Sequence, residues 1–134
     1  MHWHAYQWTG AGADRENEAE RRPGSPDFPT SPLPPMRTGD WLLKSASRIA
    51  ATFDEVTQAV AWMAGEYNKA RPALLSPDAI PLPDRLETAR ELLPLGVDVQ
   101  WGEWLHDGRF VTIGVICCPN RHAPHPCPIR RPSA

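Results

Sequence analysis

The residues best suited to chemistry lie near the C-terminus, where the stretch from Cys117 to Cys127 holds five cysteine and histidine side chains. Zinc binds four nitrogen or sulfur ligands in a tetrahedron, and short spacings between ligands let one loop surround the ion. Cys117 and Cys118 are adjacent on an expected strand, so their side chains point to opposite faces and only one of them should bind. The sequence therefore predicts, as candidate zinc ligands, Cys118, His122, His125 and Cys127.

A competing interpretation of the same stretch needs no metal. One cysteine is then buried at the end of a strand, another is an exposed thiol, and the histidines belong to a proline-rich tail. The stretch lacks the Cys-x2-Cys pairs of zinc ribbons and fingers, which favours this alternative. A redox function is disfavoured further, because the sequence has no Cys-x-x-Cys pair and a disulfide between neighbouring cysteines is strained.

A second group of titratable side chains surrounds an expected hairpin turn and consists of Glu103, His106, Asp107 and Arg109. General acid–base catalysis needs such groups to converge on a pocket, whereas a hairpin tip is normally exposed. The sequence contains no glycine-rich phosphate loop, nucleophile elbow or His-Glu-x-x-His motif. We therefore expect a non-catalytic protein.

Tryptophan is the other unusual residue type, with six among 134 residues. Trp41 and Trp62 fall on one line of an expected long helix, away from its apolar stripe, and Trp104 falls on the half-polar face of an expected hairpin. Exposed tryptophan is typical of interface anchors, so these three side chains are candidate partner-binding residues. The alternative is that the hairpin or a second helix covers them, because tryptophan is well buried on average.

A long helix is expected from Asp40 to Ala70, because apolar residues recur there at helical spacing and Pro72 prevents continuation. The apolar positions are Leu42, Ala46, Ile49, Phe53, Val56, Val60, Met63 and Tyr67. The segment Thr52–Glu55 has a capping-box pattern, so the alternative is two helices that meet near Ala51.

A short second helix and a β-hairpin are expected to follow. The helix begins with Pro83, a residue that suits the first helical position, and ends before Pro94. The hairpin joins 97–106 to 109–118 through Asp107-Gly108, a pair that suits a type I′ turn.

A two-residue turn fixes the expected register of this hairpin, with Trp101 opposite Gly114. One face then carries Val97, Val99, Trp101, Leu105, Phe110, Ile116 and Cys118. The second strand is apolar on both faces, so we expect it to be central in a sheet and the first strand to be an edge. A hairpin alone has no central strand, so a third strand must come from residues 71–82 or from a second molecule. This is the reason for expecting a homodimer.

Proline accounts for 16 of 134 residues and is concentrated towards both ends of the chain. We expect residues 1–35 to be a disordered tail, because their composition buries too little apolar surface to offset the entropy of ordering. The alternatives are an aromatic recognition motif on a tether, and a chain that starts at Met36. Residues 36–118 then form one small α+β domain, and residues 119–134 form a proline-rich tail with the Cys/His cluster.

The expected fold class is therefore α+β. A long N-terminal helix and a short second helix pack on an antiparallel β-hairpin, between a disordered N-terminal tail and a proline-rich C-terminal tail.

The charge balance limits the choice of function. The net charge is −2 at pH 7, which disfavours nucleic-acid binding, because such binding draws its affinity from a basic surface. We recognise no secretory signal or membrane span, and three cysteines do not suit a disulfide framework. We expect a cytoplasmic, non-catalytic interaction or accessory protein with a protein partner or a second copy of itself. The alternative is a small zinc protein, with a structural ion or, less favoured, a catalytic one; DNA binding is the third interpretation.

Overall fold

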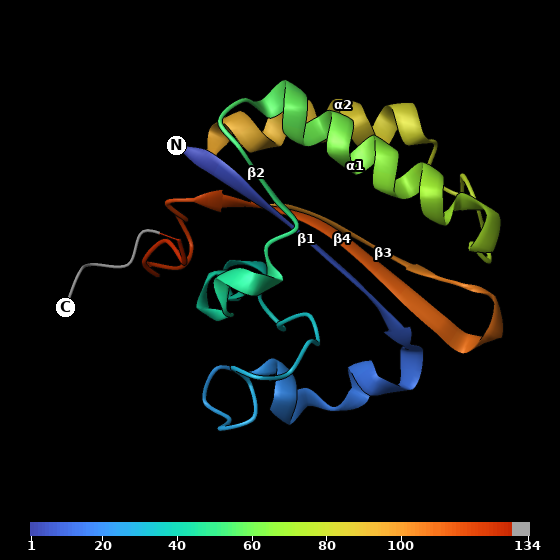
Figure 1. Cartoon of the computed structure of the whole chain (residues 1–134). Coiled ribbons are helices and arrows are strands. Elements are labelled where there is room, and N and C mark those ends of the chain that lie inside the picture. The colour runs from blue at the N-terminus through green and yellow to red at the C-terminus, as the bar shows by residue number, and fades with distance from the viewer. Residues whose placement is uncertain (130–134) are drawn as a thin grey trace.

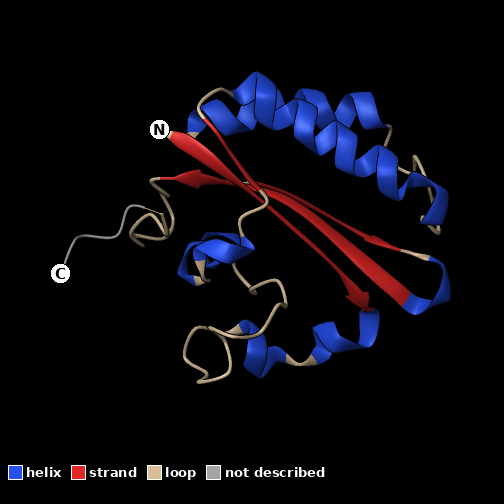
Figure 2. Ribbon diagram, in the orientation of Figure 1, coloured by secondary structure: helices blue, strands red, loops and turns tan. Residues whose placement is uncertain are grey.

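A four-stranded antiparallel sheet forms the centre of the molecule. In the computed structural model, which describes residues 1–129, the strands follow the order β2-β1-β4-β3. They are β1 (His2–Ala11), β2 (Ala51–Phe53), β3 (Val99–Trp104) and β4 (Arg109–Cys118). The helices α1 (Val56–Ala70) and α2 (Leu82–Leu92) lie together over one face of the sheet (Figures 1 and 2).

The two faces of the sheet carry different side chains and have different covers. The helix face carries Trp3, Ala5, Trp101, Ile113, Val115 and Cys117, which share one apolar core with α1 and α2. The opposite face, here called the loop face, carries His4, Tyr6, Trp8, Ile116 and Cys118. Short 3-10 helices and connecting loops cover the loop face, where apolar packing is divided between two smaller clusters (Figure 2).

The prediction that residues 1–35 are disordered is wrong, because β1 is a central strand. It pairs with β4 over its whole length, from His2 opposite Cys118 to Ala11 opposite Arg109. Its aromatic residues alternate between the two faces and suit a strand that is covered on both sides. The proline-rich stretch that follows packs on the loop face and contributes buried side chains, namely Phe28, Leu33, Pro34 and Pro35. Proline lowers the conformational entropy of the unfolded chain, so ordering a proline-rich stretch costs less entropy than ordering an irregular stretch without proline.

Two cationic side chains hold this irregular stretch in place. Lys44 Nζ donates hydrogen bonds to the carbonyl oxygens of Phe28 and Ser31, at 2.7 and 2.9 Å. Arg21 Nε donates to the carbonyl oxygen of Pro34 at 2.7 Å. These side chains satisfy backbone carbonyls in a segment that has no regular secondary structure.

The prediction of one long helix from Asp40 to Ala70 is also wrong. The first part of that range holds the 3-10 helices η3 (Thr38–Leu43) and η4 (Ala46–Arg48), followed by β2, and only α1 is an α-helix. The strand β2 forms because Ala51–Phe53 pairs with Trp3–Ala5, a partner that a disordered N-terminus could not supply. The alternative of two helices that meet near Ala51 is wrong as well, because β2 lies there, although the helical segments are interrupted at this point. The apolar stripe of α1 packs in the core on the helix face as expected.

The second helix and the hairpin are confirmed, but the register of the hairpin differs by one residue. Three residues, His106–Gly108, join the strands, and Leu105 N donates to the carbonyl oxygen of Arg109 at 2.7 Å. Asp107 and Gly108 both have left-handed backbone angles, with φ of 67° and 71°. The turn therefore uses the expected residues in a longer connection.

This one-residue shift changes which side chains share a face. Trp101 lies opposite Ile113 and not opposite Gly114. Because side chains alternate along a strand, a shift by one moves each residue of one strand to the other face relative to its partner strand. Phe110, Ile116 and Cys118 accordingly lie on the loop face, away from Trp101.

The expectation that the second hairpin strand is central is confirmed, since β4 lies between β1 and β3. Its additional partner is the N-terminal strand, and not a connector or a second molecule. The unpaired edge that was the reason for expecting a homodimer is thus occupied by β1, and the oligomeric state stays a prediction.

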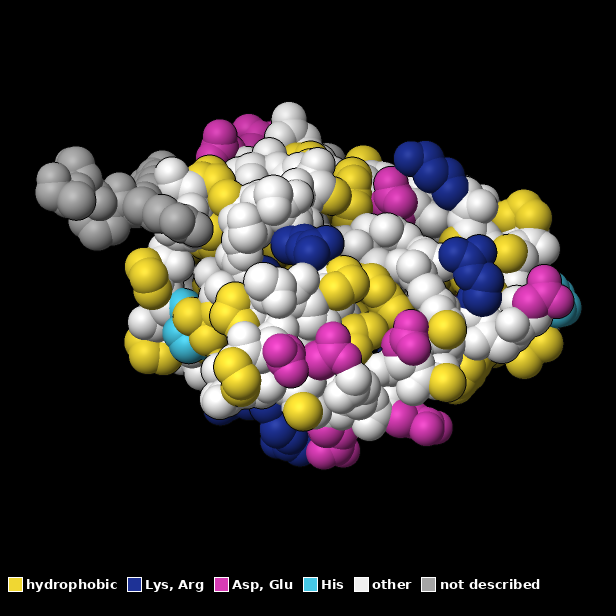
Figure 3. Space-filling view, turned by 60° about the horizontal axis from the view of Figure 1, so that its bottom comes forward, with side chains coloured by type: hydrophobic (Ala, Val, Ile, Leu, Met, Phe, Trp, Pro, Cys, Tyr) yellow, Lys and Arg dark blue, Asp and Glu magenta, His cyan; other side chains and the backbone are white. Residues whose placement is uncertain are grey.

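The surface on the loop side carries charges of both signs. Figure 3, which turns this side toward the viewer, shows Lys and Arg side chains interspersed with Asp and Glu. Within residues 1–129, neither helix has the length and apolar character needed to cross a bilayer.

Candidate metal centre

Four side chains at one end of the sheet could hold a metal ion. His2, His4, Cys118 and Cys127 each offer one ligand atom, and these atoms all lie within 4.8 Å of one another. His4 and Cys118 are buried, whereas His2 and Cys127 are partly exposed. The cluster lies where β1 begins and β4 ends, so it brings the first strand of the chain next to the loop that follows the last one (Figure 1).

The sheet itself positions three of the four side chains. His2 and His4 are two residues apart on β1, so both point to the loop face. Cys118 lies directly opposite His2 in the β1–β4 ladder. Side chains of such cross-strand pairs are within contact distance, and the register therefore fixes this part of the site.

The fourth side chain, Cys127, is brought to the site by the C-terminal loop, residues 119–129. This loop packs closely on η3: a Cβ atom built on Gly39 would lie 2.7 Å from the Cβ of Ala123. The neighbouring residue Asp40 is buried, and its Oδ1 is hydrogen-bonded to His125 Nε2 at 2.9 Å. These contacts fix the position of the backbone at His125, two residues before Cys127.

The beginning of the same loop is held by Asn120, which is buried. Its Nδ2 donates to both carboxylate oxygens of Asp98, at 2.9 and 3.0 Å, and its Oδ1 accepts from His122 N at 3.0 Å. Asp98 also accepts from Cys117 N at 2.8 Å and from Thr38 Oγ1 at 2.8 Å. The network joins the loop to β4 and to η3, the two elements between which Cys127 must be held.

The distances between the ligand atoms of His2, His4 and Cys127 are close to those in a tetrahedral zinc site. The Nε2 atoms of His2 and His4 are 3.1 Å apart, and Cys127 Sγ lies 3.4 Å from each of them. With zinc–nitrogen bonds of about 2.0 Å and zinc–sulfur bonds of about 2.3 Å, tetrahedral angles give about 3.3 Å between nitrogens and about 3.5 Å between nitrogen and sulfur. His2, His4 and Cys127 therefore need to move by only tenths of an ångström to bind one ion, and Cys118 Sγ lies within 4.8 Å of their ligand atoms.

The state of His4 suits a metal ligand. Burial, and secondarily the nearby His2, lower the pKa of His4 to about 4, so the ring is neutral near pH 7. Its Nδ1 is hydrogen-bonded to Thr52 Oγ1 at 2.8 Å. A proton on Nδ1 leaves the lone pair of Nε2 for an ion, and an outer partner of this kind is usual for metal-binding histidine.

Cys117 takes no part in this cluster, as expected from strand alternation. It is fully buried on the helix face, with Sγ 3.8 Å from the carbonyl oxygen of Leu93. Burial, and secondarily the Asp98 carboxylate, raise the pKa of this thiol to about 12. Cys117 is therefore a protonated core residue.

The structure brings together only part of the ligand set expected from the sequence. Cys118 and Cys127 are in the cluster, whereas His125 is bonded to Asp40 and His122 is exposed. The two candidate ligands that the sequence analysis does not identify are His2 and His4. Their signal is the His-x-His spacing within a run of alternating aromatic residues, and it has no weight as long as residues 1–35 are expected to be disordered.

The three candidate partner-binding tryptophans lie in different environments. Trp41 is buried, stacks on Tyr6 and donates from Nε1 to Gln100 Oε1 at 2.8 Å. Trp62 is partly buried against the core of the helix face. Trp104 is 46% exposed and meets Phe110 edge to face. They do not form one surface, because the long helix expected to align the first two is absent.

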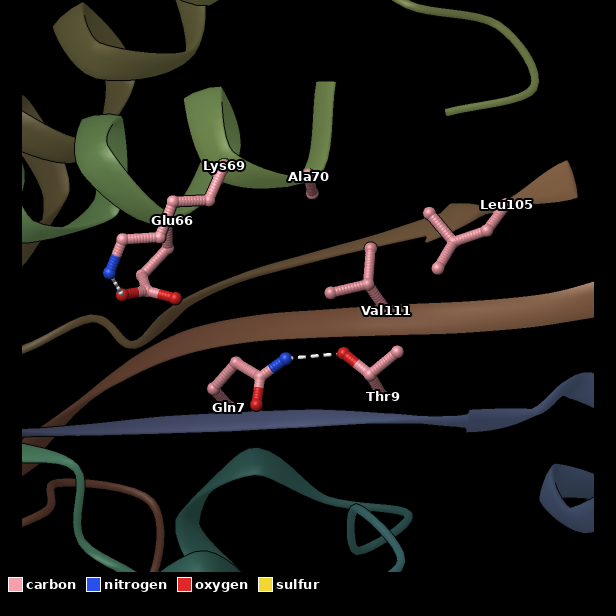
Figure 4. A pocket seen from close by; sticks show the side chains of 7 residues that line it. All are labelled: Gln7, Thr9, Glu66, Lys69, Ala70, Leu105 and Val111. Atoms are coloured by element: carbon pink, nitrogen blue, oxygen red, sulfur yellow. Dashed lines mark hydrogen bonds and ion pairs between the residues drawn. The ribbon is translucent and has the colours of Figure 1, made fainter. Parts of the chain in front are cut away.

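A hollow beside the sheet is less suited to chemistry than the His/Cys cluster. It lies between the end of α1 and strands β1 and β4, and Figure 4 shows the side chains that line it. Its polar groups are paired with each other: Lys69 with Glu66, at 3.1 Å, and Gln7 with Thr9. The other lining residues are apolar, namely Ala70, Leu105 and Val111.

Comparisons of the chain with protein-family models, with curated proteins and with solved structures give no match.

Proposed function

We propose that the protein binds one zinc ion through His2, His4, Cys118 and Cys127, and that this ion is structural. The observation that carries the proposal is the spacing of the ligand atoms of His2, His4 and Cys127, which is close to that around a tetrahedral ion, with Cys118 Sγ within 4.8 Å of them. Two cysteines and two histidines are a common ligand set of structural zinc sites. Four protein ligands leave no coordination position for a substrate or an activated water, which supports a non-catalytic function.

The proposed ion joins two segments that are far apart in sequence. His2 and Cys127 are separated by 125 positions, yet their side chains are in contact. An ion at this point ties the start of β1 to the C-terminal loop and closes one end of the loop face. Because the unfolded chain does not present such a site, the free energy of binding adds to the stability of the fold.

The proposed site also bears on the location and the partners of the protein. None of the three cysteines is in a disulfide bond, and thiolate ligands persist best under reducing conditions, which supports a cytoplasmic location. An interaction with a protein partner or with a second copy stays a prediction. Of the three tryptophans considered for it, Trp104 is the one whose side chain is largely accessible.

The proposal is tested by cobalt(II) and zinc titration of the full chain and of two matched variants, His4→Ala and His122→Ala. Tetrahedral cobalt–thiolate sites absorb strongly, and zinc displaces the cobalt, so one titration yields geometry and affinity. We expect His4→Ala to weaken zinc binding by more than the roughly 10- to 100-fold that the loss of an outer-shell partner costs. His122 is exposed, so His122→Ala should bind zinc as the unaltered chain does.

The reverse result, with loss of binding in His122→Ala and not in His4→Ala, would favour the ligand set expected from the sequence. A chain that gives no thiolate absorption with cobalt and no competition with zinc would exclude the proposed function.

A further inference from the structure

Tyr6 continues the line of side chains that begins with His2 and His4. The three residues alternate along β1 and point to the loop face. The Tyr6 ring is fully buried and stacks on Trp41, with ring centroids 4.6 Å apart and planes inclined by 16°. The indole of Trp41 is in turn fixed by its hydrogen bond to Gln100. The phenol is therefore held in one orientation.

The hydroxyl of Tyr6 is a buried polar group that lacks a protein partner. Among the described residues, its oxygen is the one buried side-chain nitrogen or oxygen atom without a hydrogen bond. Such a group costs stability, and a phenylalanine would fill the same space without that cost. Buried unsatisfied groups are rare in native proteins, so the presence of the hydroxyl calls for a physical reason.

The surroundings of this hydroxyl point to the two cysteine ligands. Tyr6 and Cys118 belong to one apolar cluster, against which Cys127 is packed. A thiol is a weak hydrogen-bond acceptor, whereas a metal-bound cysteine is a thiolate with full negative charge. Metal binding would thus create a strong acceptor in the cluster that holds the unused donor.

We propose that Tyr6 donates a hydrogen bond to a metal-bound thiolate, that of Cys118 or Cys127, and so stabilises the zinc-bound form. This inference rests on the proposed zinc site and assigns Tyr6 as a positioning residue, not as a ligand. A charge-assisted hydrogen bond to sulfur spreads the thiolate charge and fixes the side chain that carries it. The same hydroxyl that is unfavourable in the metal-free protein is favourable once an ion is bound.

The test compares Tyr6→Phe with the matched variant Tyr67→Phe. Tyr67 is equally buried but lies on the helix face, where its hydroxyl accepts from Asp78 N at 3.0 Å. We expect Tyr6→Phe to leave the metal-free protein as stable as before or more stable, and to weaken zinc binding about 10- to 100-fold. Tyr67→Phe should lower the stability and leave the zinc affinity unchanged, because it loses a satisfied hydrogen bond far from the cluster.

A spectroscopic measurement tests the same bond without altering Tyr6. The chain has two tyrosines, so Tyr67→Phe leaves Tyr6 as the single source of the tyrosine Raman doublet. Zinc should shift the intensity ratio of this doublet toward that of a hydroxyl that donates a hydrogen bond. An unchanged ratio on saturation with zinc contradicts the inference.

The outcomes separate this inference from the zinc site on which it rests. If the unaltered chain binds zinc and Tyr6→Phe binds it equally tightly, the role of Tyr6 is overturned while the zinc site stands. If the unaltered chain binds no zinc, the proposed function fails and the inference with it. If Tyr6→Phe loses zinc affinity while its metal-free fold is at least as stable, the inference is supported.

Discussion

Cys117 and Cys118 are neighbours in the chain but lie on opposite faces of β4, and the two faces differ in how they are held together. Cys117 lies on the helix face in a continuous apolar core that α1 and α2 close. Cys118 lies on the loop face beside two histidines and a second cysteine. Burial alone therefore does not decide the chemistry of a thiol: both are buried, and within residues 1–129 only Cys118 lies among other candidate metal ligands.

The comparison extends to the whole sheet. The helix face gains its stability from apolar area, at roughly 25 cal/mol per Å² removed from water. The loop face has smaller apolar clusters and is held in addition by individual polar contacts. These contacts include the bonds of Lys44 to the proline-rich stretch and of Asn120 to Asp98. We infer that the stability of the loop face depends on charge, and on the proposed metal ion, to an extent that the stability of the helix face does not.

The largest expected effect on stability concerns Lys44, whose ammonium group is buried on the loop face. Burial, and secondarily the nearby Arg48, lower its pKa from 10.5 to about 8, so the unfolded chain binds more protons between these two pH values. The free energy of unfolding should therefore rise with pH through this window, by about 3 kcal/mol in total for this group. Chemical denaturation of the unaltered chain and of Lys44→Met, at several pH values from 7 to 10.5, isolates the contribution as the difference between the two.

In that difference the titration of all other groups cancels to first order. A difference that stays flat across the window would show that the Lys44 ammonium is solvated, and that the proline-rich stretch is not packed over it as described.

A smaller effect is expected from a matched pair of glycine substitutions, one in η3, which covers the loop face, and one in α1, which covers the helix face. Gly39→Ala places a methyl group 2.7 Å from Ala123, so the C-terminal loop must move away from η3 and carry Cys127 with it. We expect zinc affinity to fall about tenfold, within the range of other losses of outer support. Gly65→Ala lies in α1 with open space around it and should stabilise the fold by about 0.5–1 kcal/mol without any change in zinc affinity.

Chemical denaturation of both variants measures the change in the free energy of unfolding, and zinc competition measures the change in zinc affinity. Equal zinc affinity in the two variants would mean that the packing of the loop on η3 does not position Cys127.

Most elements of the helix face can be predicted from the sequence, whereas few features of the loop face can. The apolar stripe of α1, the prolines that flank α2 and the Asp107-Gly108 turn are local patterns, and each predicted its element. The strand β1 and the segment after it depend on contacts with β4 and Lys44, which lie far away in the sequence. The composition averaged over 35 residues does not show that side chains in His2–Trp8 alternate as in a strand, so β1 was not predicted.

The same distinction explains why the metal site was predicted in part. Cys118 and Cys127 are close in sequence, so a search for short ligand spacings finds them. His2 and His4 join them only through the β1–β4 register. The one-residue shift in the hairpin also decides which of the two adjacent cysteines faces the loop side, and no local pattern specifies that shift.

Native mass spectrometry of the full chain and of Cys117→Ala and Cys118→Ala, each equilibrated with zinc and then freed of excess, tests the central claim most directly. The two substitutions remove neighbouring buried thiols from opposite faces of one strand. We predict one zinc ion per chain for the unaltered protein and for Cys117→Ala, and none for Cys118→Ala. Equal zinc content in the two variants, whether one ion or none, would contradict the assignment of the loop face as the metal-binding face.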